Sequence, residues 1–257
     1  PSKAASSAKA APLTIAEQGY FFVAGQYSAG KDGQIMTGQM YVQYQIPQKR
    51  THRYPIVMWH GGGQTGTNFL GTPDGRMGWA EYFVRQGYAV YVVDQPGRAR
   101  SGYFTDVYGP TRRPNATAMS ERFTAPEVAK RYPQASLHTQ WPGSGTAGDP
   151  TFDQFFASQV EDMSNLTTLE ELNRNAGTAL LDKIGPAILL THSQSGPFGW
   201  EIADSRPALV KAVVAVEPNG PPFYENSVVG APDWFKDAAM GRAWGITRTA
   251  LSYSPAV

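Results

Sequence analysis

The stretch that most constrains the fold is an apolar run that ends at a serine, Ile188 to Gly196, with the sequence Ile-Leu-Leu-Thr-His-Ser-Gln-Ser-Gly. The run is typical of a buried strand, and helix-compatible sequence follows it. Two positions either side of Ser193 stand Thr191 and Ser195, small residues that leave room for a tight strand-to-helix turn. Such a nucleophile elbow pushes the serine hydroxyl out above a sheet. The alternative interpretation is a strand end followed by a serine N-cap.

A second feature is a run of three glycines that directly follows another short apolar segment, Pro55–Trp59, in the order His60-Gly61-Gly62-Gly63. Glycine allows positive φ and a close approach of the backbone to a ligand. A strand followed by this pattern is typical of a loop whose N–H groups bind an oxyanion. The alternative interpretation is a flexible surface turn.

The order of the other segments predicts a parallel sheet. Helical spacing over 77–86 is followed by buried strands over 88–94 and 210–216, and the second of these ends at Glu217. The carboxyl ends of parallel strands meet at one edge, so Glu217 is placed like a catalytic acid. The alternative role is capping of the next turn. Near the start, two strands at 20–24 and 38–46 predict an antiparallel pair joined through turn-rich sequence.

Composition excludes several classes of function. The 257 residues carry a formal net charge of +1, so no electrostatic footprint for nucleic acid is present. No apolar stretch approaches the roughly 20 residues that span a bilayer, which predicts a soluble protein without a membrane partner. With no cysteine, a thiolate nucleophile or thiolate metal site is excluded. The sequons at Asn115 and Asn165 leave glycosylation open.

Together these motifs resemble the α/β-hydrolase superfamily over roughly residues 20 to 220. The sequence is similar, more narrowly, to a small esterase branch whose triad acid is a glutamate after the strand that follows the elbow; the segments 59–61 and 73–79 also match that branch. The resemblance implies an α/β fold with a mostly parallel sheet and helices on both faces. It implies a Ser-Glu-His triad with Ser193 as nucleophile and Glu217 as acid, and an oxyanion hole formed by the N–H groups of Gly62 and Gln194. No metal or cofactor is expected.

The sequence departs from this pattern in its histidines. Triad partners in this fold follow the order serine, acid, histidine, yet none of the four histidines comes after Glu217. These are His52, His60, His138 and His192. The predicted sheet is also shorter than usual by two strand-helix units. We therefore expect the catalytic histidine and the last strands beyond Val257, in a longer protein or in a separate segment of the same particle.

The predicted organisation is a flexible tail over 1–12 and a hydrolase domain over 13–257 that is incomplete at its C-terminus. That domain holds an insertion over 103–150 and a lid or rim over 221–257. The predicted function is carboxylic ester hydrolysis through an acyl-enzyme, on a small-molecule ester. Cleavage of a lactone, amide or carbon–carbon bond, and a non-catalytic binding protein of the same fold, stay open. So do a homodimer and a C-terminal segment outside this chain as partners. A start without methionine and a polar Ala/Ser/Lys tail favour a secreted or periplasmic protein.

Overall fold

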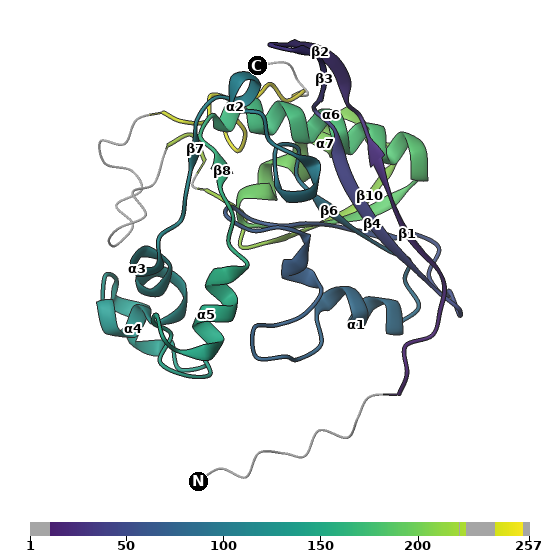
Figure 1. Cartoon of the computed structure of the whole chain (residues 1–257). Coiled ribbons are helices and arrows are strands. Elements are labelled where there is room, and N and C mark those ends of the chain that lie inside the picture. The colour runs from purple at the N-terminus through teal and green to yellow at the C-terminus, as the bar shows by residue number, and fades with distance from the viewer. Residues whose placement is uncertain (1–10, 221, 225–239, 254–257) are drawn as a thin grey trace.

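The computed structural model of the chain describes residues 11–220, 222–224 and 240–253. Its centre is a six-stranded sheet with the order β1-β4-β6-β5-β9-β10 (Figure 1). The pairs β6–β5, β5–β9 and β9–β10 are parallel, whereas β1–β4 and β4–β6 are antiparallel. The strands are β1 (Ile15–Val23), β4 (Met40–Pro47), β5 (Ile56–Trp59), β6 (Val90–Asp94), β9 (Ala187–His192) and β10 (Val210–Val216). The mixed, mostly parallel sheet predicted from the sequence is confirmed.

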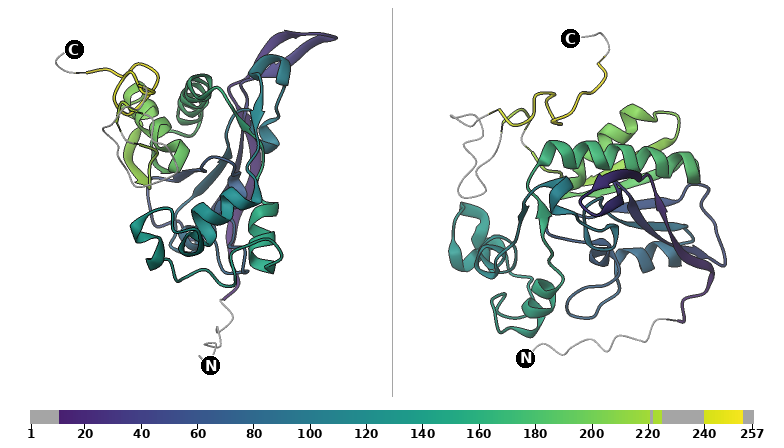
Figure 2. Two further views of the ribbon diagram at one scale, coloured as in Figure 1. Left: turned by 90° about the vertical axis from the view of Figure 1, so that its left-hand side faces the viewer. Right: turned by 45° about the horizontal axis from the view of Figure 1, so that its top comes forward.

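Helices cover both faces of this sheet (Figures 1 and 2). On one face lie α6 (Leu166–Ile184) and α7 (Gly196–Ser205), which pack Leu180 and Phe198 against Trp59. The other face is covered by α1 (Trp79–Arg85), whose Val84 joins a second apolar cluster. All four residues of β5 are buried because that strand lies between the two clusters. The short, unbroken apolar run that opens the glycine loop is therefore explained by burial on both sides.

The predicted turn between the first two strands is instead a hairpin. Strands β2 (Gln26–Gly30) and β3 (Gly33–Thr37) pair antiparallel, with Gly30 opposite Gly33, and the ribbon extends away from the main sheet (Figure 2). The prediction of the antiparallel pair β1–β4 is confirmed. The β2–β3 hairpin between these strands was not predicted, because its sequence is rich in turn residues. Its strands bury little apolar surface, so they carry no strong alternating pattern.

The segment 103–150 is built from short pieces. It contains α2 (Thr105–Tyr108), β7 (Thr111–Arg112), α3 (Ala116–Met119), η3 (Ser120–Thr124), α4 (Pro126–Ala129) and η4 (Pro133–Leu137). Next come α5 (Pro150–Ala157) and β8 (Asp162–Met163), and β8 pairs with β7. This small ribbon ties the segment to the carboxyl edge of the main sheet, where β5, β6 and β9 end.

Residues 240–253 run along α6 and α7. Arg248 donates from Nη1 to Glu170 Oε1 at 2.8 Å, and Ser252 N lies 3.2 Å from both carboxylate oxygens of Asp204. Most of the proposed lid or rim over 221–257 and most of the N-terminal tail lie outside the described residues. Within the described part of the chain, β10 has β9 as its one sheet neighbour, and Val214 on it is 47% exposed.

Candidate functional site

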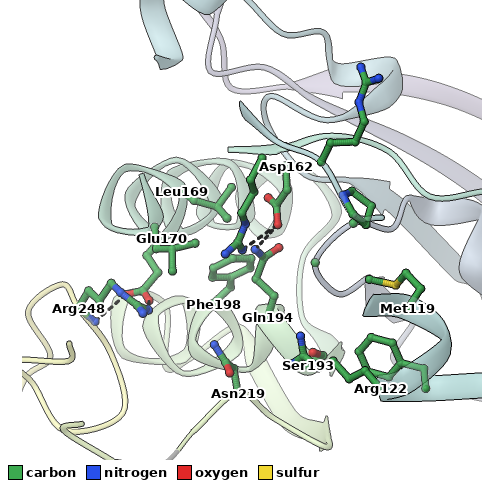
Figure 3. Close-up of a pocket in the computed structure, with 17 residues that line it drawn as sticks. Met119, Arg122, Asp162, Leu169, Glu170, Ser193, Gln194, Phe198, Asn219 and Arg248 are labelled. Carbon is green, nitrogen blue, oxygen red and sulfur yellow. Dashed lines mark hydrogen bonds and ion pairs between the residues drawn. The ribbon is translucent and has the colours of Figure 1, made fainter. Parts of the chain in front are cut away.

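The serine turn has the geometry that the sequence predicts for an elbow. Strand β9 ends at His192, Ser193 takes a φ of 54°, and η5 (Ser193–Ser195) leads directly into α7. A positive φ at a residue with a Cβ is a strained conformation that surrounding structure must enforce. The strain turns the chain sharply between strand and helix, and Ser193 faces a cavity at the carboxyl edge of the sheet (Figure 3).

The two residues that replace the usual elbow glycines are each accommodated. A Cβ at Gly199 of α7 would lie 3.0 Å from Thr191 Cγ2, so the missing side chain there leaves the room that Thr191 fills. Ser195 Oγ accepts from His192 N at 2.8 Å and lies 3.0 Å from Trp59 O, to which it donates. The turn is kept because Gly199 makes room for Thr191, whose buried hydroxyl has no hydrogen-bond partner among the described residues, and buried hydrogen bonds hold Ser195.

The glycine loop lies directly against the elbow. A Cβ at Gly61 would come within 3.1 Å of Ser193 Cβ, and one at Gly62 within 3.4 Å of Gln194 Nε2. Gln64 Oε1 accepts from Gly61 N at 3.0 Å and lies 3.2 Å from His192 Nδ1, so its amide joins loop and elbow. Among the described residues, Gly62 N–H has no hydrogen-bond acceptor. The structure thus brings an unused backbone donor next to the candidate nucleophile.

His60 supports this loop and is held neutral. It is fully buried; burial, followed by the positive charge of Arg98, lowers its pKa to about 3. Its Nε2 accepts from Gln95 N at 3.2 Å, which leaves the proton on Nδ1 to be donated to Gly61 O at 2.9 Å. The ring therefore fixes the Gly61 peptide plane, and its contacts are with Gly61 and Gln95 rather than with Ser193.

A buried ion pair that sequence reasoning missed connects the loop with the elbow. Arg98 and Asp162 form a salt bridge with side chains only 1% and 4% exposed. Arg98 Nη1 donates to Gln64 O at 2.9 Å. Asp162 Oδ2 accepts from Gln194 Nε2 at 2.8 Å (Figure 3). The pair thus contacts Gln64 in the glycine loop and the side chain of Gln194 in the elbow. Arg98 lies in a turn that the sequence marks as polar, but no sequence signal singles out Asp162.

Glu217 lies at the predicted edge. Val216 pairs with His192 in the parallel register of β10 and β9, so Glu217 follows its strand where Ser193 follows its own. Glu217 has a φ of 44° and is exposed. The turn after it docks on the elbow, because Asn219 N donates to Ser193 O at 2.8 Å. The structure therefore brings together Ser193, Gln194, Gly62 and Glu217 at one edge of the sheet.

All four histidines of the chain lie in its described part, and none donates to or accepts from the Ser193 hydroxyl. His52 stacks on Tyr88 with ring centroids 3.7 Å apart. His138 Nδ1 lies 2.9 Å from Glu127 Oε2, in the segment 103–150. His192 contacts Gln64, and burial lowers its pKa. The histidine predicted for the triad is thus not among the side chains that meet at the elbow.

The cavity beside Ser193 has a volume of about 310 Å³. Its walls come from the glycine loop, the segment 103–150, α6, α7 and the described C-terminal residues (Figure 3). The lining side chains include Arg112, Arg113, Met119, Arg122, Phe123, Asp162, Leu166, Leu169, Glu170, Phe198 and Arg248. Within residues 11–220, 222–224 and 240–253, no group of three His, Asp or Glu side chains could hold a metal ion, and no helix is long and apolar enough to cross a membrane.

A mostly parallel sheet with a strained serine turn and a glycine loop at its carboxyl edge defines the hydrolase class of α/β proteins. The chain is 44% identical over 236 residues to the probable secreted lipase phiG of a fungal species (strain ATCC 74256). The match covers 92% of this chain and 60% of that protein, so the chain spans less than two thirds of its relative.

A solved structure of a novel bacterial esterase is 35% identical to the chain, with a TM-score of 0.62. The match covers 81% of this chain and 70% of the esterase. No family model matches the sequence. The chain belongs to the α/β-hydrolase superfamily, as the sequence motifs predicted.

Proposed function

We propose that the protein hydrolyses carboxylic esters through an acyl-enzyme formed on Ser193. The observation that carries the proposal is the strained Ser193 with Gly62 N–H, which has no acceptor among the described residues, on the loop packed against it. Both relatives described above are named as enzymes that act on esters, a lipase and an esterase.

In this mechanism Ser193 Oγ attacks the ester carbonyl carbon, and the carbonyl oxygen becomes an oxyanion. The N–H groups of Gly62 and Gln194 donate to that oxygen; Gln194 stands in the first turn of η5, where backbone N–H groups lack intrahelical acceptors. One such donor is worth about 10²–10³ in rate. A histidine oriented by Glu217 takes the serine proton and returns it to the leaving alcohol, and water then hydrolyses the acyl-enzyme by the same route.

We place that histidine outside residues 1–257, because the four histidines here contact other groups than Ser193. Glu217 is exposed beside the edge strand β10, so a segment that adds to the sheet there would reach it. The fungal relative is named a probable secreted lipase, and we propose that this protein is secreted as well.

A fluorophosphonate probe tests the nucleophile in the full-length gene product. We expect labelling that Ser193→Ala abolishes and Ser195→Ala, the matched control on the same turn, retains. Glu217→Gln should keep the fold and lower kcat by orders of magnitude, as loss of an orienting acid does in other triads. Labelling at Ser195, or full esterase activity of residues 1–257 alone, would overturn the assignments of nucleophile and base respectively.

A further inference from the structure

The cavity beside Ser193 is lined by more basic than acidic side chains. Its arginines are Arg112, Arg113, Arg122 and Arg248, and its carboxylates are Asp162 and Glu170. A neutral ester gives no reason for such an excess, because the oxyanion is stabilised by backbone donors. Concave sites lined by one sign of charge concentrate ligands of the opposite sign.

Both carboxylates of the cavity are already paired. Asp162 accepts from Arg98 and, at 2.9 Å, from Arg112. Glu170 Oε1 accepts from Arg248 at 2.8 Å, and both of these side chains are nearly buried. Neither carboxylate is therefore free to neutralise a further guanidinium in the cavity.

Arg122 is the arginine left over. Among the described residues its guanidinium has no carboxylate or hydrogen-bond partner, and it lies over the ring of Phe123, 4.8 Å from the ring centroid. Arg113 differs, because it pairs with Glu161. Burial, followed by the positive charge of Arg112, lowers the pKa of Arg122. Arg122 is solvent-exposed, so water satisfies its donors; an anion at this place would replace that water and relieve the repulsion.

The remaining walls of the cavity are largely apolar. They include Met119, Phe123, Leu166, Leu169 and Phe198. The cavity volume of about 310 Å³ lies at the lower end of the range for small-molecule sites. This is room for a short aliphatic chain with a polar group at its end. Figure 3 shows Arg122 and Ser193 at the same side of the cavity.

We propose that the protein acts on esters that carry a free carboxylate, such as monoesters of aliphatic dicarboxylic acids, and that Arg122 binds this carboxylate. The planar guanidinium matches a carboxylate with two parallel N–H···O bonds. The apolar walls hold the chain, and the ester group lies at Ser193. This inference rests on the proposed ester hydrolysis at Ser193.

The test compares two p-nitrophenyl esters of equal chain length in the full-length protein, the monoester of glutaric acid and the neutral pentanoate. The quantity measured is the ratio of their kcat/KM values. We expect a ratio above one in the wild type and a fall of about 10- to 100-fold in Arg122→Gln, the size expected for a charge-assisted pair. Arg122→Lys keeps the positive charge but loses the two parallel donors of the guanidinium, so it should give an intermediate ratio of kcat/KM values. The advantage of the charged ester should shrink as salt rises.

Arg131→Gln is the matched control, because Arg131 lies in the same segment, pairs with Glu121 and does not line the cavity. It should leave the ratio within about threefold. Thermal unfolding midpoints check that each variant is folded. A wild-type ratio below one, or a ratio that Arg122→Gln leaves within threefold, overturns the carboxylate proposal while ester hydrolysis stands. Failure to hydrolyse either ester overturns both.

Discussion

Replacing Asp162 by asparagine should destabilise the protein and slow it at the same time. Asp162 Oδ1 accepts from Arg98, and Oδ2 accepts from Gln194 and Arg112. Asparagine has one acceptor oxygen, so its NH₂ group must face one of these donors. Arg98 is then left buried, with its side chain 1% exposed and no carboxylate beside it.

The structure sets the size of both effects. Removing one partner of a buried pair costs about 3–5 kcal/mol, because an uncompensated charge stays in the interior. Arg112, 54% exposed, contributes less than about 1 kcal/mol to its pair with Asp162, so Arg112→Gln is the matched control. We expect kcat to fall by about 10- to 100-fold in Asp162→Asn. Outright loss of an oxyanion donor costs about 10²–10³, and here Gln194 N–H remains but loses its support.

Equilibrium denaturation in urea, followed by tryptophan fluorescence, measures the free energy of unfolding of each variant. Initial rates on a short-chain p-nitrophenyl ester, at saturating substrate and below the unfolding transition, give kcat. If Asp162→Asn and Arg112→Gln lower the free energy of unfolding equally, within about 1 kcal/mol, the Arg98–Asp162 ion pair does not stabilise the protein as proposed. Unchanged kcat in a folded Asp162→Asn protein would refute the link to the oxyanion hole.

Two further predictions concern the frame of the site. Gly199→Ala should lower the free energy of unfolding by about 1–3 kcal/mol, because its Cβ would lie 3.0 Å from Thr191 and Val213. Adding Thr191→Ala to this variant should recover part of the lost stability. Equal stability of Gly199→Ala and the wild type would disprove this close fit. Burial raises the pKa of Glu201 to about 8, so the folded state keeps a proton that the unfolded state loses above about pH 4.5. Stability should therefore fall from about pH 5 to pH 8, by at most about 1.4 kcal/mol per pH unit, and urea titrations of Glu201→Gln should lack this slope.

Local patterns could predict the sheet and the elbow because each depends on neighbouring residues. A strand buried on both faces must be apolar throughout, and a strained turn needs small flanking residues. Both features therefore produce a recognisable pattern within nine residues of sequence. The elbow remained readable with Thr191 and Ser195 in place of glycine. Gly199, which makes room for Thr191, stands eight positions away and reads as an ordinary helical residue.

The support of the site could not be predicted, because it depends on residues far apart in the chain. Arg98 and Asp162 are 64 positions apart and meet only after β8 pairs with β7. Single acidic residues such as Asp162 are most often solvated, so nothing in the sequence sets this one apart. The proposed role of Arg122 could not be predicted either, because it depends on the ion pairs that the other cavity arginines form.

The shared carboxylate of Asp162 has a consequence for how enzymes of this design diversify. Substrate-binding insertions are commonly exchanged between relatives because they are separable from the machinery beneath them. Here the ribbon of β7 and β8 carries a cavity arginine on one strand and the partner of Arg98 on the other. Exchanging this ribbon for one without a carboxylate at position 162 would leave Arg98 buried without its ion-pair partner. Laboratory evolution of this site should therefore randomise positions 98, 112 and 162 jointly.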